Sequence, residues 1–138
     1  MKYSLHTLKN GLRVVLAPMK GTETATMIVM SGTGSRYETP EQNGLAHFLE
    51  HMFFKGTKKR TSAKAIAEEL DGIGSVSNAF TSEERTAYYA KVDADYLPTA
   101  LDVVSDIFLN STLPAKEIEK ERGAIIQEID MYEDIPIR

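Results

Sequence analysis

The sequence predicts an α+β fold, with a mostly antiparallel sheet and helices packed on one side of it. Two observations support this prediction. Extended and amphipathic segments follow one another in the order βββ-α-α-ββ-α-α. Short turns join neighbouring extended segments, which is typical of antiparallel pairing. The chain of 138 residues is long enough for one domain with a buried core, so we expect a single domain over residues 1–138.

Three strands are expected first, at 3–7, 12–17 and 25–30. Asn10-Gly11 lies between the first two, and this pair supplies the positive φ angles that a tight hairpin needs. The third segment is apolar enough to be a central strand. The glycine-rich run 31–35 then interrupts the pattern, and 40–44 is expected to be a loop.

The rest of the chain alternates helical and extended patterns. The expected elements are helices 45–54 and 62–70, strands 76–80 and 85–92, and helices 93–109 and 114–132. Ser62 and Asp93 are suited to cap the helices that follow them. The first helix has an apolar side that we expect to face the core: Leu45, Phe48, Leu49, Met52 and Phe53.

Composition excludes several classes of protein. There is no cysteine, so disulfides, thiolate nucleophiles and cysteine zinc sites are absent. The formal net charge of −4 argues against a nucleic-acid partner, and we interpret the basic cluster 55–60 as a solvated turn. No apolar run spans a membrane, and the start resembles neither a signal nor a transit peptide. We expect no membrane partner, and a location in a bacterial cytoplasm or, alternatively, as a processed protein of an organellar matrix.

One short motif has the spacing of a metal site. His47 and His51 are four residues apart, so on a helix both imidazoles share a face, with Glu50 beside them. The order H-x-x-E-H is the inverzincin signature, in which two histidines bind Zn²⁺ and the carboxylate accepts a proton from water. A histidine pair at this spacing is also a common coincidence on protein surfaces. The remaining histidine, His6, is interpreted as structural or exposed.

A zinc site of this type needs a third protein ligand, and the last helix offers two. Glu121 and Glu128 are seven residues apart, at the border of an expected buried stripe of Ile118, Ile125 and Ile129. Two aligned carboxylates could bind a buried cation. Alternatively, they are exposed to solvent or form an ion pair with Arg122. Spacing alone leaves open which of the two binds metal.

Several segments resemble the pitrilysin/insulinase family of zinc peptidases, closest to the branch of mitochondrial processing peptidase and its bacterial relatives. The matching segments are 12–15, 34–38, 44–52, 54–57, 78–81, 119–122 and 128–129. The resemblance implies a zinc-dependent endopeptidase that hydrolyses peptides or unfolded segments. It implies one Zn²⁺ held by His47, His51 and Glu128, since 76 residues lie between His51 and Glu128 as in the family. Glu50 is then the general base, and Glu121 supports the ligands.

The same resemblance implies how peptide binds. Asn78, Ala79 and Phe80 lie in a strand that we expect to form a sheet edge, where an extended peptide can pair with free backbone groups. Family members are longer and have two related halves, so the expected partners are the remaining C-terminal half, a peptide and a second copy of the chain. The alternatives are a catalytically incomplete fragment, a non-catalytic peptide-binding or structural subunit that keeps the zinc site, and a metal-sensing module.

Overall fold

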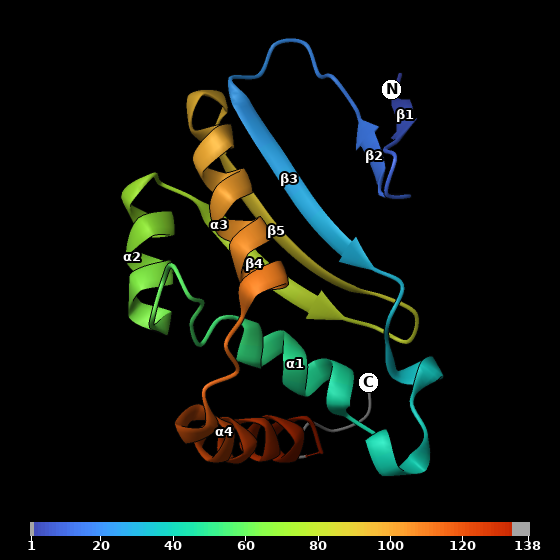
Figure 1. The fold of residues 1–138 in the computed structure, drawn as a ribbon, viewed down its shortest axis with the longest axis vertical. Helices are drawn as coiled ribbons and strands as arrows, with labels where there is room; N and C mark the ends of the chain where they lie inside the picture. Colours follow the sequence, from blue (N-terminus) through green and yellow to red (C-terminus); the bar gives the residue numbers. More distant parts are fainter. Residues whose placement is uncertain (1, 134–138) are drawn as a thin grey trace.

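The computed structural model describes residues 2–133, which form two antiparallel sheets and four α-helices (Figure 1). The elements are β1 (Ser4–Thr7), β2 (Arg13–Leu16), β3 (Thr24–Ser31), α1 (Leu45–Phe53), α2 (Ala63–Gly72), β4 (Val76–Thr81), β5 (Thr86–Asp93), α3 (Leu97–Asn110) and α4 (Ala115–Glu133). The predicted α+β class, element order and antiparallel pairing are confirmed. Within the described residues, no helix is both long and apolar enough to cross a membrane.

The strands divide between two sheets instead of forming one. The hairpin β1–β2 turns at Gly11, which has φ +86°, and among residues 2–133 its strands pair only with each other. The second sheet has the order β3-β5-β4, so β4 is one of its two edges. Tyr88 of β5 lies opposite Val29 of β3 and Ala79 of β4, so β5 joins the two edge strands in one antiparallel layer.

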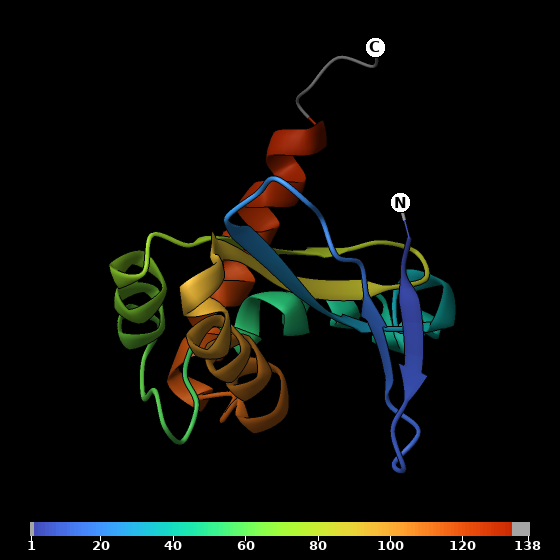
Figure 2. The same cartoon turned by 90° about the horizontal axis from the view of Figure 1, so that it is seen from above.

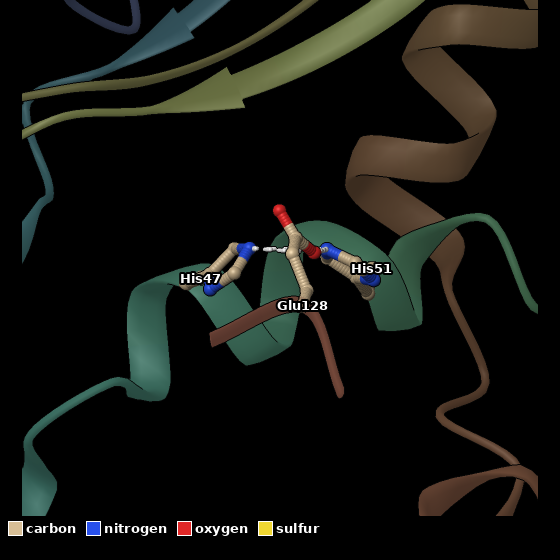
Figure 3. A group of neighbouring side chains, drawn as sticks. All are labelled: His47, His51 and Glu128. Carbon is tan, nitrogen blue, oxygen red and sulfur yellow. Dashed lines mark hydrogen bonds and ion pairs between the residues drawn. The ribbon is translucent and has the colours of Figure 1, made fainter. Parts of the chain in front are cut away.

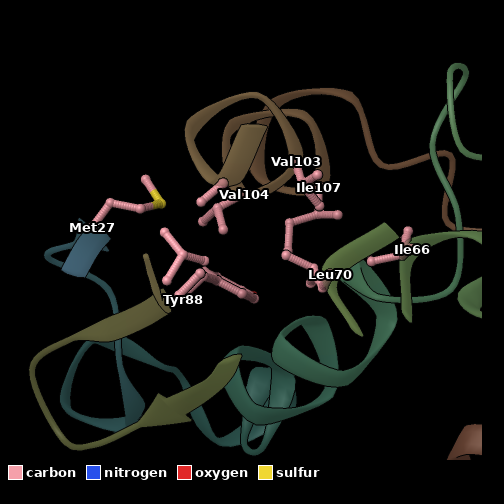
Figure 4. Close-up of a cluster of buried hydrophobic side chains, with 10 residues drawn as sticks. Met27, Ile66, Leu70, Tyr88, Val103, Val104 and Ile107 are labelled. Carbon is pink, nitrogen blue, oxygen red and sulfur yellow. The ribbon is translucent and has the colours of Figure 1, made fainter. Parts of the chain in front are cut away.

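The core lies between this three-stranded sheet and the helices. Helices α1 and α3 lie on the same side of the sheet (Figure 2). Alternate residues of β5 face them, and Tyr88 stacks on Phe53 of α1 with ring centroids 5.5 Å apart. Val103 and Ile107 of α3 and Leu70 of α2 complete the cluster around this ring (Figure 4). Burying these side chains contributes about 1.5–3 kcal/mol each, which fixes α1 and α3 on the sheet.

The predicted cap of α2 is confirmed, whereas Asp93 caps a short 3-10 turn and α3 itself starts at Leu97 without a side-chain cap. The Ser62 hydroxyl accepts a hydrogen bond from the backbone N–H of Ala65 at 3.2 Å. Asp93 accepts from the N–H of Asp95, in a short 3-10 turn that leads into α3. The expected inward position of Leu45 is wrong, because this first residue of α1 is 46% exposed and Ala46 is buried instead. Helical periodicity gives no information about the segment before α1, which is exposed to solvent.

Helix α4 lies against α1, on the side of α1 away from the sheet (Figure 1). In the described part of the chain, the core cluster takes no side chain from α4. The predicted stripe is therefore only partly right: Ile125 is buried, whereas Ile129 is 49% exposed. Glu121, expected at the border, is buried at 8% exposure. The face of α4 turned toward α1 is partly polar, because it meets the histidines of α1.

The basic cluster 55–60 is only partly a solvated turn, because Lys58 and Lys59 are exposed but Arg60 is not. Arg60 is 3% exposed, and its guanidinium donates to Glu69, Asp102 and Asp106 at 2.6–2.8 Å. The hydrogen bonds to Glu69 raise the pKa of Arg60 above its ordinary value, against the effect of burial. The Arg60 side chain therefore ties the loop between α1 and α2 to both α2 and α3.

Candidate metal centre

Helix α1 presents the two histidines of the motif and is held at its start by a carboxylate outside the helix. Gly44, immediately before α1, has φ +87°, a backbone conformation that favours glycine. The Glu38 carboxylate accepts hydrogen bonds from the N–H groups of Gly44 at 2.7 Å and Ala46 at 2.6 Å. Anions are stabilised at helix N-termini, so Glu38 fixes the turn that bears His47.

The segment that contains Glu38 is itself anchored to the turn between β4 and β5. The backbone N–H of Arg36 donates to the carbonyl of Glu83 at 2.9 Å, and the Arg36 side chain forms an ion pair with Glu84. A Cβ at Gly34 would lie 2.2 Å from the carbonyl oxygen of Ser82, so only glycine allows this approach. Glu38 has no predicted role from the sequence, although the segment Gly-x-x-x-Glu that contains it is part of the family resemblance.

Side chains of α1 and α4 converge on one point (Figure 3). The Nε2 atoms of His47 and His51 are 3.1 Å apart. Glu128 Oε2 lies 3.8 Å from His47 Nε2 and 3.6 Å from His51 Nε2. All three side chains are half-buried, and together they form a group able to hold a metal ion. The structure thus brings together the three residues that the sequence predicted as ligands.

The distances between the three donor atoms fit a tetrahedral zinc ion. With bonds of about 2.1 Å, two ligand atoms of such an ion lie about 3.4 Å apart. Two imidazoles and a carboxylate are also ligands that Zn²⁺ accepts. This combination, with a further carboxylate nearby, is of the kind found in hydrolytic zinc sites.

Glu121 contacts the back of the His51 ring. Its Oε1 lies 2.9 Å from His51 Nδ1, and its Oε2 lies 2.5 Å from Lys55 Nζ. Burial alone would raise the pKa of Glu121, but the hydrogen bonds from Lys55 and His51 outweigh it and hold the pKa below its ordinary value. An ionised carboxylate only accepts hydrogen bonds, so His51 Nδ1–H is the donor to Glu121, and Nε2 is the ring nitrogen that faces His47 and Glu128.

Glu50 extends from α1 to the end of β4. Its Oε2 accepts a hydrogen bond from the Thr81 hydroxyl at 2.5 Å, at the end of β4. Hollows lie on both sides of the histidine pair. One of about 410 Å³ is lined by His47, Thr81 and Glu128 among others. The other, of about 220 Å³, is lined by Glu50, His51 and Asn78 among others.

The predicted peptide-binding residues lie on β4, an edge of the three-stranded sheet. Asn78 and Phe80 are exposed, and Ala79 between them is half-buried and packs against the core. Asn78 Oδ1 accepts from the N–H of Ala79 at 2.9 Å. His6, by contrast, is exposed on β1 and bonds to Ser4, in line with the expectation for it.

Comparison with known proteins identifies the family. The family profile described as Insulinase (Peptidase family M16) matches residues 13–137. The chain therefore belongs to the insulinase family of peptidases, and the resemblance in its motifs is confirmed.

The relatives include zinc proteases from bacteria and a mitochondrial enzyme. An uncharacterized zinc protease of Bacillus subtilis (strain 168), YmxG, is 51% identical over 131 residues, covering 95% of this chain and 32% of that protein. The mitochondrial-processing peptidase subunit beta of Caenorhabditis elegans is 50% identical over 124 residues, covering 90% of this chain and 27% of that protein. The chain thus spans about a third of the length of these relatives.

Solved structures show the same fold. The crystal structure of a protease from Helicobacter pylori matches with a TM-score of 0.86 and 35% identity, over 92% of this chain and 30% of that one. Pitrilysin matches with a TM-score of 0.84 and 35% identity, over 95% of this chain and 14% of that one. In both, the matched region is a minor part of a longer chain.

Proposed function

We propose that the protein to which this chain belongs is a zinc-dependent endopeptidase that cleaves peptides or unfolded segments. The convergence of His47, His51 and Glu128, with donor atoms 3.1–3.8 Å apart, supports this most directly. The zinc proteases among the relatives support the same metal. When bound, zinc supplies Lewis acidity, which acidifies water and polarises a peptide carbonyl.

In this proposal each residue of the centre has a distinct role. His47, His51 and Glu128 bind the ion, and Glu121 keeps the His51 ring in the tautomer that presents Nε2. Glu50 accepts a proton from the attacking water and delivers it to the nitrogen of the leaving amine. Its position on the same helix as both histidines, one residue before His51, favours this role over that of a fourth ligand.

We further propose that the substrate adds a strand to the edge of β4 beside Asn78, Ala79 and Phe80. Backbone pairing of this kind tolerates many sequences, which suits a peptidase of unfolded segments. The side chain of Asn78 bonds to the N–H of Ala79, so a peptide that uses this N–H must displace the amide. The exposed ring of Phe80, 41% accessible, offers an apolar contact.

Other parts of the proposed enzyme lie outside these residues. The relatives are about three times as long, and we propose that this chain is the N-terminal zinc-binding domain of a two-half peptidase. We propose that the second half supplies groups that stabilise the oxyanion. A homodimer is a further proposed assembly. Both bacterial and mitochondrial relatives exist, so the bacterial cytoplasm and an organellar matrix remain the proposed locations.

Zinc content and cleavage of an unstructured peptide test the proposal. Both are measured on the full-length protein and on variants with matched substitutions. Glu50→Gln is expected to keep zinc and lose cleavage, whereas His47→Ala and Glu128→Ala are expected to lose both. Glu119→Gln, an exposed change on α4, is the control. Full cleavage by Glu50→Gln would refute the mechanism, and a zinc-free wild type without cleavage would favour a non-catalytic subunit.

A further inference from the structure

We propose that Thr81 is a positioning residue for Glu50: its hydroxyl holds one carboxylate oxygen, so that the other is the proton acceptor. This inference rests on the proposed function and deepens it. The contact is the 2.5 Å hydrogen bond from Thr81 Oγ1 to Glu50 Oε2. A hydrogen bond to a charged acceptor is about twice as strong as a neutral one, and it restrains the rotation of the carboxylate.

The direction of this hydrogen bond follows from a chain of four groups, which runs from the Thr33 carbonyl through the Thr86 and Thr81 hydroxyls to Glu50. Thr86 Oγ1 donates its only proton to the carbonyl oxygen of Thr33 at 2.9 Å. Thr81 Oγ1 lies 3.3 Å from Thr86 Oγ1 and 2.5 Å from Glu50 Oε2. Thr86 therefore has no proton to give to Thr81, and the proton of Thr81 goes to the nearer, charged acceptor. Within residues 2–133, no group donates to Glu50 Oε1, so this oxygen is left for the water.

The backbone around Thr81 is held from two sides. Thr81 and Thr86 form the last pair of the β4–β5 ladder, and the N–H of Ser82 closes the turn by donating to Arg85 at 2.9 Å. The Gly34–Arg36 segment packs over this turn, as described above. A β-branched side chain has few χ1 rotamers, so the Thr81 hydroxyl is aimed by a rigid frame.

A threonine at this place also has an ordinary explanation, because threonine is favoured in strands. The two readings differ in what valine does. Valine has nearly the shape of threonine and suits a strand as well, so a purely structural Thr81 tolerates it. A positioning Thr81 does not, because the hydroxyl is lost.

The experiment compares Thr81→Val, Thr81→Ser and Glu50→Gln in the zinc-loaded full-length protein. Thr81→Val is expected to lower kcat about 10-fold to 100-fold, since a misplaced catalytic group costs up to that much, with KM and zinc content unchanged. Thr81→Ser keeps the hydroxyl and is expected to restore most of the rate. Thr26→Val, a change at an exposed threonine of β3, is the matched control and is expected to keep full activity.

Crystal structures of wild type and Thr81→Val give a second readout that does not depend on turnover. The Glu50 carboxylate is expected to take a different rotamer when the hydroxyl is absent. An unchanged kcat or an unchanged Glu50 rotamer in Thr81→Val would overturn the inference, as would a Thr81→Ser variant as slow as Thr81→Val. If Glu50→Gln itself retains full activity, the proposed function fails and the inference falls with it. If Glu50→Gln loses activity but both Thr81 variants behave as wild type, the proposed function stands and the inference about Thr81 fails.

Discussion

Replacing Glu121 by glutamine tests how much the contact behind His51 contributes to metal binding. The substitution keeps an oxygen that can accept from His51 Nδ1 and removes the negative charge. At 2.9 Å and 8% exposure the carboxylate is poorly screened by solvent. The Lys55 ammonium lies 2.5 Å from Glu121. In the variant, this positive charge is no longer neutralised by the Glu121 carboxylate, and it lies near the proposed zinc ion. Both effects weaken zinc binding.

The expected size of this effect comes from the general behaviour of groups behind metal ligands. Removing such a partner weakens metal binding by about 10-fold to 100-fold, which corresponds to about 1.4–2.8 kcal/mol. Because a glutamine oxygen replaces the carboxylate oxygen, we expect Glu121→Gln in the lower half of this range. Glu128→Gln removes a proposed ligand and is expected to cost more.

Competition with a chromophoric chelator at neutral pH measures these affinities. Glu119→Gln is the control, because it makes the same change on the same helix at a side chain that is 73% exposed. An affinity of Glu121→Gln within about twofold of this control would contradict the reasoning. A larger loss in Glu121→Gln than in Glu128→Gln would exchange the roles of the two carboxylates.

Three further predictions concern stability. Asp106→Asn removes a buried partner of Arg60 and is expected to lower the free energy of unfolding by about 2–4 kcal/mol in urea titrations; an effect no larger than that of the exposed Glu68→Gln would contradict this. Burial would raise the pKa of Asp106, but hydrogen bonds hold it below its ordinary value of 3.8. The stabilisation that ionised Asp106 gives to the folded state is therefore full above pH 3.8 and is lost as pH falls through the lower native pKa. In Asp106→Asn, the free energy of unfolding should depend less on pH in this acidic range. Glu38→Gln weakens the cap of α1 and should lower the free energy of unfolding by about 1 kcal/mol in the same urea titration. The control Glu68→Gln is expected to leave the free energy of unfolding unchanged. Removal of zinc should accelerate hydrogen exchange in α4 before β5, and equal acceleration in both would refute a local effect.

Local periodicity was sufficient to predict much of the fold and the shared helix face of the two histidines. The four-residue spacing of His47 and His51 places both rings on one helix face whatever the rest of the chain does. Alternation in β4 and β5 similarly fixes which side chains face the helices. The choice of Glu128 over Glu121 came from resemblance, since spacing alone allowed either; the structure places Glu128 beside both Nε2 atoms and Glu121 behind one ring.

Features that depend on distant partners were missed. Arg60 is buried because Asp106, 46 positions along the chain, accepts from it, and a hydrophilic run gives no sign of such a partner. Ile129 is exposed because the neighbour of α4 is a helix surface with histidines, so polar contacts replace part of the expected apolar stripe. The cap from Glu38 depends on a left-handed Gly44 that folds the carboxylate back onto the helix. Each of these is a property of two segments together.

The packing of α4 against α1 has a consequence for how the molecule could be divided. The loop 111–114 joins α3 to α4, and the donor set has two histidines before it and one carboxylate after it. If the chain were cut at this loop, a metal ion held by ligands from both pieces would add to their affinity for each other. Reassembly of the pieces would then rise and fall with free zinc concentration, which makes the domain a starting point for a zinc-controlled split protein.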